Sequence, residues 1–172
     1  MPKSIRRVQN RAVLGRGVVL HSSAAVIDGK GVVFLAPSGG GKSTTVQALA
    51  MTDAEILGDD STVVSRGTDG VWRMIPCAVF TWFTGKRPSA RKLDKLMILE
   101  KGEPALLKTV DPIYARYRIL RENSIMAHGE MEPEERTVLR RVVRELCSKF
   151  PVTILRWSEP NSLQRVLFET VE

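Results

Sequence analysis

The sequence has only two cysteines and two histidines, few aromatic residues and no long apolar run. Cys77 and Cys147 lie far apart, outside any C-x-x-C pair or Cys/His cluster with metal-ligand spacing, so free thiols in a reducing cytoplasm fit best. The apolar run from Val18 to Leu20 is too short for a signal-peptide core, and nothing reaches transmembrane length. We therefore expect a cytoplasmic protein with no membrane partner.

Composition and net charge further restrict the class of protein and the kind of partner. A chain of 172 residues with 43% hydrophobic and 26% charged residues is typical of a globular protein, and we predict one domain over residues 1–172. The net charge of +7 favours anionic partners such as nucleotides, acidic peptides or nucleic acid. Nucleic acid is not expected, because no basic stretch is interleaved with aromatic residues. The basic clusters near the start and between Lys86 and Lys95 are better explained as solvated faces.

The pattern of apolar residues predicts an α/β fold with a mixed β-sheet and flanking helices. Short β-branched runs precede the turn at 28–31, which indicates antiparallel strands before the strand that follows. The polar segment 84–89 is either an exposed loop near a substrate or a plain connector. The expected strands lie within 12–20, 24–27, 32–35, 62–65, 71–75, 96–100, 105–110 and 152–155, and the expected helices at 44–51, 113–121, 134–150 and 162–168.

One stretch between a predicted strand and a predicted helix has the pattern of a phosphate-binding loop. Glycines let backbone N–H groups curl around phosphate oxygens, Lys42 would reach the β- and γ-phosphates, and the Ser43 hydroxyl would ligate Mg²⁺. The alternative is a glycine-rich turn that merely enters a helix, and the strand and helix on either side favour the phosphate loop. The residues expected to hold a nucleotide are Pro37, Ser38, Gly39, Gly40, Gly41, Lys42, Ser43 and Thr44, preceded by Ala36.

Asp59 and Asp60 follow the first helix, where the chain is expected to return to the sheet. Beside a phosphate and Mg²⁺, one carboxylate can hold the metal while the other accepts a proton from an attacking hydroxyl. The alternative is an acidic turn that caps the next element. Position after a phosphate loop favours the catalytic interpretation.

His21 is a third candidate because it ends a β-rich run just upstream of the loop, so the hairpin can bring it beside the phosphate site. Its ordinary pKa near neutrality suits orienting or charging a carboxylate. A lone histidine is nevertheless more often a hydrogen-bonded structural residue. His128 lies in a polar stretch next to Gly129 and is given no role.

These residues together resemble the catalytic domain of HPr kinase/phosphorylase, a P-loop fold related to that of phosphoenolpyruvate carboxykinase. The resemblance covers residues 19–65, where a histidine stands 21 positions before the loop lysine and an aspartate 18 positions after it. It implies that Asp60 accepts the proton, Lys42 clamps the phosphate, and Ser43 and Asp59 hold Mg²⁺. The loop departs from the family only in beginning with Ala36 and in having Thr44 where an acidic residue often follows the serine.

The resemblance predicts an ATP-dependent, Mg²⁺-requiring kinase that phosphorylates a hydroxyl of a protein, a peptide or a small molecule, with a serine preferred. Relatives often assemble into rings, which implies a homo-oligomer. Because no glutamate occurs between Glu55 and Glu100, the family's metal-linked glutamate is missing and phosphorylase activity is not expected. The rival hypothesis is a nucleotide-binding regulator that has lost transfer chemistry. We also expect an arginine to contact the acceptor or the transferred phosphate, with three candidates, Arg73, Arg87 and Arg91.

Overall fold

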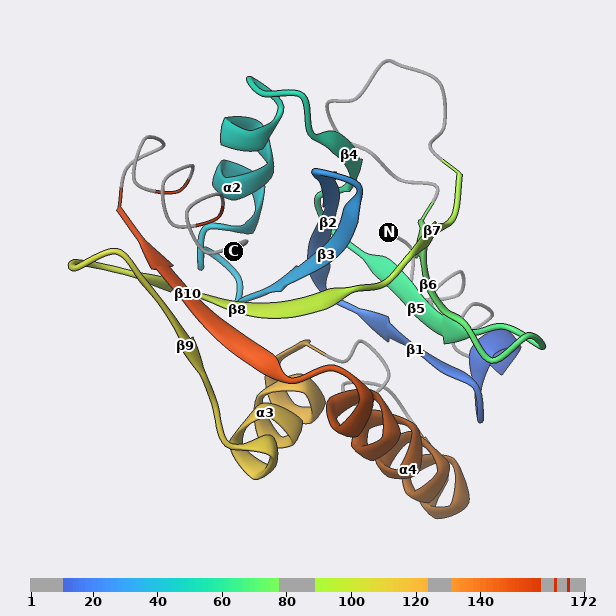
Figure 1. Cartoon of the computed structure of the whole chain (residues 1–172). Helices are drawn as coiled ribbons and strands as arrows, with labels where there is room; N and C mark the ends of the chain where they lie inside the picture. The colour runs from blue at the N-terminus through green and yellow to red at the C-terminus, as the bar shows by residue number, and fades with distance from the viewer. Residues whose placement is uncertain (1–10, 78–88, 124–130, 159–162, 164–166, 168–172) are drawn as a thin grey trace.

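The computed structural model describes residues 11–77, 89–123, 131–158, 163 and 167, and its strands form two sheets (Figure 1). The larger sheet has six strands in the order β4-β2-β3-β8-β10-β9, and the smaller has four in the order β1-β5-β6-β7. The elements are β1 (Gly17–Leu20), β2 (Ser22–Ile27), β3 (Lys30–Leu35), α2 (Lys42–Leu49), β4 (Glu55–Gly58), β5 (Thr62–Arg66), β6 (Trp72–Pro76), β7 (Arg91–Lys92), β8 (Lys95–Lys101), β9 (Leu106–Thr109), α3 (Pro112–Arg118), η1 (Ile119–Asn123), α4 (Pro133–Lys149) and β10 (Val152–Trp157).

The larger sheet is mixed, which confirms the predicted α/β class. β3 pairs with β8 in parallel and β8 pairs with β10 in parallel, whereas β2, β4 and β9 run antiparallel to their neighbours. The antiparallel smaller sheet was not predicted as a separate unit. It exists because the chain turns at His21, between β1 and β2, and at 59–61, between β4 and β5, so β1 and β5 pair with each other.

Helices cover the larger sheet on both faces, as Figure 1 shows. Alternate residues of β3 divide between two apolar clusters: Val32 and Phe34 pack with α2, and Val33 and Leu35 pack with α3, α4 and the smaller sheet. Burial on both faces explains why β3 and β8 are almost continuously apolar. The sheet therefore holds the loop between β3 and α2 on a rigid, fully packed support.

Several predicted elements differ in extent from the structure. The strand expected within 12–20 is limited to Gly17–Leu20, and residues 11–13 are helical instead. The hairpin expected at 62–65 and 71–75 is confirmed as β5 and β6, and the amphipathic helix expected at 134–150 is confirmed as α4. Most of the helix expected at 162–168, most of the segment 84–89, and His128 lie outside the described residues.

Among the residues that the structure describes, no helix has both the length and the apolar character needed to cross a lipid bilayer.

Candidate functional site

The predicted site residues follow strand ends that meet at one edge of the larger sheet. Ser22, the first residue of β2, lies opposite Leu35, the last residue of β3. Gly58, the last residue of β4, lies opposite Ala24 near the start of β2. The turn at His21, the loop after β3 and the turn after β4 therefore lie at the carboxyl end of β3. Ligands of open α/β sheets bind at such carboxyl ends.

The loop between β3 and α2 depends on glycine at three consecutive positions. Gly39 and Gly41 have φ angles of 74° and 95°, which side chains rarely allow. Gly40 donates a backbone hydrogen bond to the Pro37 carbonyl oxygen at 3.0 Å. A Cβ atom at Gly40 would lie 2.6 Å from the Cβ atom of Ala36. The close turn is thus incompatible with larger residues at these positions.

Helix α2 begins with backbone amides that have no partner within the helix. Gly41 is the N-cap and offers no side-chain acceptor, and the first turn contains no acidic residue. Thr45 is the first residue whose amide reaches a helical carbonyl, that of Gly41 at 2.8 Å. The amides of Lys42, Ser43 and Thr44 have no acceptor in an α-helix, and the side chains of Ser43 and Thr44 are exposed. This helix start can accept an anion.

Lys42 lies beneath the loop and is only 6% exposed. Its Nζ atom donates hydrogen bonds to the carbonyl oxygens of Ala36 at 2.8 Å and Pro37 at 3.1 Å. Burial lowers the pKa of Lys42 below its ordinary value, while the nearby Asp60 carboxylate raises that pKa in part. Lys42 and Asp60 are therefore within electrostatic reach of each other. On the other side, Ser23 of β2 donates its hydroxyl to the Lys42 carbonyl oxygen at 3.3 Å.

Asp59, Asp60 and His21 are placed at the same edge by neighbouring strand ends. Asp59 is 6% exposed, whereas Asp60 and His21 are half-buried. Leu20 lies opposite Thr62 in the β1–β5 pair, so His21 adjoins the turn that contains both aspartates. Within the described ranges, no three His, Cys, Asp or Glu side chains gather as a metal site. The structure thus brings the predicted residues to one edge, and their roles remain predictions.

Two of the three arginines expected near the acceptor are held in ion pairs. The Arg91 guanidinium donates two hydrogen bonds of 2.9 Å to Glu55, which link β7 and β4. Arg73 pairs with Asp69 at the β5–β6 turn, with its Nη2 atom 2.6 Å from Oδ2. Neither guanidinium is available without breaking an ion pair. Arg87 lies outside the described residues.

Two residues at this edge were missed by the sequence-based predictions. Lys101 is the last residue of β8, and its Cε atom lies 3.6 Å from where a Cβ atom on Gly41 would be. Ser23 contacts the start of α2, as described above. A strand was expected at 96–100, but no pattern in the nearby sequence indicates that this strand pairs in parallel with β3. A buried serine in a strand likewise gives no sign of its partner.

Comparison with protein families identifies the group to which this sequence is related. Residues 1–158 match the family model described as "SynChlorMet cassette protein ScmC". The chain belongs to the ScmC family. No protein with a curated description matches it. Among solved structures, this ScmC family member is similar to the Hpr(Ser) kinase/phosphatase from Coxiella burnetii, with 17% identity over 76% of this chain and 91% of that chain and a TM-score of 0.43.

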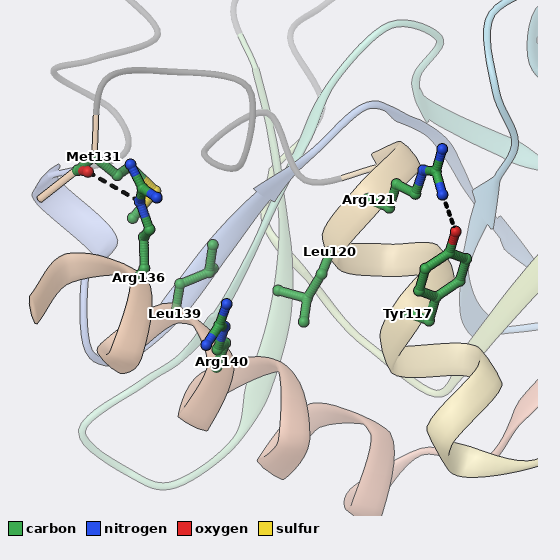
Figure 2. A pocket seen from close by; sticks show the side chains of 7 residues that line it. All are labelled: Tyr117, Leu120, Arg121, Met131, Arg136, Leu139 and Arg140. Atoms are coloured by element: carbon green, nitrogen blue, oxygen red, sulfur yellow. Dashed lines mark hydrogen bonds between the residues drawn. The ribbon is translucent and has the colours of Figure 1, made fainter. Parts of the chain in front are cut away.

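This ScmC family member also has a cavity of about 380 Å³ between η1 and α4, lined by three arginines (Figure 2). Arg121 donates a hydrogen bond to the Tyr117 hydroxyl, and the Nε atom of Arg136 donates to the Met131 carbonyl oxygen at 3.0 Å. The guanidinium of the third arginine, Arg140, makes no hydrogen bond or ion pair within the described part of the chain. The cavity is basic, but α4 packs on the opposite face of the larger sheet from α2. It is therefore separate from the loop site.

Proposed function

We propose that this ScmC family member is an ATP-dependent, Mg²⁺-requiring kinase that transfers the γ-phosphoryl group to a hydroxyl, with a serine in a protein or peptide as the acceptor. One observation supports the proposal above all others. The loop with the phosphate-binding sequence lies between a strand and a helix at the carboxyl edge of the sheet, and its lysine is within electrostatic reach of Asp60.

Nucleotide binding is supported by the shape of the loop and by the start of α2. The unpartnered amides at the helix start and the positive end of the helix dipole favour phosphate oxygens. Lys42 would exchange the neutral carbonyls of Ala36 and Pro37 for charged phosphate oxygens, which form stronger hydrogen bonds with an ammonium group. The amides would orient the phosphates, and Lys42 would stabilise the charge that develops on transfer.

The donor atoms at this edge fit Mg²⁺. This ion prefers oxygen ligands, keeps several waters, and is usually held by one or two protein groups together with phosphates. Ser43 offers an exposed hydroxyl at the start of α2, and Asp59 offers a carboxylate at the turn after β4. When bound, the ion supplies positive charge that offsets the charge on the phosphate oxygens.

Asp60 is proposed as the proton acceptor. As the acceptor oxygen forms its bond to the γ-phosphorus, the bond from that phosphorus to the β–γ bridging oxygen breaks, and the hydroxyl proton passes to the Asp60 carboxylate. ADP leaves with the bridging oxygen. His21 adjoins the aspartate turn and would orient this carboxylate rather than react itself.

A nucleotide-binding regulatory module is the second candidate. It is favoured by the lack of any glutamate between Glu55 and Glu100, where the resembled kinase family has a metal-linked glutamate. Such a protein would bind nucleotide through the same loop without transferring phosphate.

Transfer of labelled phosphate distinguishes the two candidates. The protein is incubated with γ-labelled ATP, Mg²⁺ and either cell lysate or serine-containing peptides, and Asp60→Asn is compared with the wild type. Asp53→Asn is the matched control, because Asp53 is exposed in the turn after α2. We expect labelling by the wild type and Asp53→Asn, and a loss of about 100-fold or more for Asp60→Asn with ATP binding retained. ATP binding without labelling by any version favours the regulator.

A further inference from the structure

We propose that Lys101 is a second phosphate-binding lysine of this site, whose ammonium group contacts the polyphosphate from the side opposite Lys42. This inference rests on the proposed nucleotide binding and extends it to a residue outside the loop motif. The strand register places Lys101 beside the loop. Leu35, the last residue of β3, lies opposite Ile98 of β8, so β8 continues for three residues beside the loop. Three strand residues span about 10 Å.

The side chain of Lys101 reaches back over the loop. Its Cε atom lies 3.6 Å from where a Cβ atom on Gly41 would be, and Gly41 is the N-cap of α2. Because Gly41 has no side chain, the stem of Lys101 lies close against the helix start, within reach of an anion held there. Lys42 holds the loop from its buried side, and Lys101 is exposed at the end of β8. A polyphosphate at the helix start would lie between two ammonium groups.

The charge of Lys101 is not neutralised by its neighbours. Of the two acidic residues closest in sequence, Glu100 forms an ion pair with Arg156 at 2.9 Å, and Glu103 accepts a hydrogen bond from Ser158 and forms no ion pair with Lys101. Within the described residues, the Lys101 ammonium group makes no hydrogen bond or ion pair. A lysine is a compact charge on a flexible stem with three donors, and it suits phosphate oxygens whose positions change during transfer. The geometry thus favours a phosphate group over a carboxylate fixed in the protein.

The first experiment measures binding of ATP and of inorganic tripolyphosphate by calorimetry, with Lys101→Gln and Lys108→Gln compared with the wild type. Lys108 is the matched control because it is an exposed lysine on the edge strand β9 of the same sheet. We expect Lys101→Gln to lower the affinity for both ligands about five- to tenfold, and Lys108→Gln to leave both affinities unchanged. The difference in affinity between Lys101→Gln and the wild type should decrease as the salt concentration is raised, because exposed charges are screened.

The second experiment needs no variant. Lysines of the wild-type protein are acetylated with and without ATP, and the modified positions are read by mass spectrometry. We expect ATP to slow acetylation of Lys101 at least threefold and to leave Lys108 unaffected, since of these two lysines Lys101 alone contacts phosphate in this proposal.

The outcomes separate this inference from the function on which it rests. If the wild type binds ATP, but Lys101→Gln binds it as tightly as Lys108→Gln does and Lys101 is not protected, the role of Lys101 is wrong and the proposed nucleotide binding stands. If the wild type binds neither ATP nor tripolyphosphate, both proposals are wrong.

Discussion

The Nζ atom of Lys42 donates a hydrogen bond to the carbonyl oxygen of Ala36 at 2.8 Å, so the loop lysine is held by the residue that begins its own loop. This contact, with the second one to Pro37, gives a buried ammonium group the partners that burial requires. A phosphate offers charged oxygens in place of these carbonyls. Binding of ATP should therefore move Lys42 rather than leave it in place.

Replacing Lys42 by methionine separates binding from stability. We expect Lys42→Met to weaken ATP binding about tenfold or more, because the charged partner of the phosphates is lost. The free energy of unfolding should stay within about 1 kcal/mol of the wild type or increase, since an apolar side chain of similar volume replaces a buried charge. Calorimetry with ATP and urea unfolding measure the two effects. The exposed Lys30, replaced in the same way, is the control, and unchanged ATP binding by Lys42→Met would contradict the loop's role.

The lowered pKa of Lys42 predicts a pH dependence of stability. Burial lowers this pKa below its ordinary value of 10.5, so the folded protein releases the proton at a lower pH than the unfolded chain does. Between the lowered pKa and 10.5, the unfolded chain binds more protons, and stability therefore rises with pH in that window. We expect the free energy of unfolding of the wild type to increase relative to that of Lys42→Met as pH approaches 10.5. Urea unfolding at several pH values checks this, and a relative decrease would contradict it.

Both cysteines should be unreactive in the folded protein. Cys77 and Cys147 are 3% and 5% exposed and unpaired, and burial raises the pKa of both thiols, that of Cys147 to about 11. Since the thiolate is the reactive form, we expect reaction with a disulfide reagent at pH 8 to be at least about 100-fold slower in buffer than in urea. Absorbance of the released thiol measures both rates. Rapid reaction of the folded protein would show that these side chains are accessible.

The close turn at Gly40 predicts a specific effect of adding one methyl group. In Gly40→Ala the new Cβ atom would lie 2.6 Å from the Cβ atom of Ala36 and 2.9 Å from the Pro37 carbonyl oxygen, so the loop must move. We expect ATP affinity to fall about tenfold while the protein stays folded, because the loop is at the surface. Ser38→Ala, an exposed change in the same loop, should bind ATP almost normally. Equal effects of the two changes in calorimetry would contradict the importance of the turn.

Local patterns predicted much of the structure near the loop. The apolar strand before Ala36, the helix after Gly41 and the hairpin of β5 and β6 each follow from residues close together in the sequence. The extent of the first strand was wrong because the buried Val13, which is β-branched, belongs to a helical turn that packs with Val19 and Val63. Burial against a neighbour overrode strand propensity there.

Contacts between distant segments could not be predicted in the same way. The parallel pairing of β3 with β8 joins residues about 60 positions apart, so no turn or spacing indicates it. Before that pairing is known, the sequence does not indicate that Lys101 lies beside Gly41. The separation of the strands into two sheets depends on how β1 and β5 pair across the turns at His21 and 59–61, which is also a long-range contact. The roles proposed for His21, Asp59 and Asp60 remain predictions.

A crystal structure with Mg²⁺ and a non-hydrolysable ATP analogue would show whether the loop and Asp60 face the same triphosphate. We expect the β- and γ-phosphates to lie against the amides of 38–43, Lys42 to leave the Ala36 carbonyl for a phosphate oxygen, and the Asp60 carboxylate to face the γ-phosphate. An empty loop with Lys42 still bound to Ala36, or an Asp60 carboxylate turned toward solvent while nucleotide is bound, would contradict it.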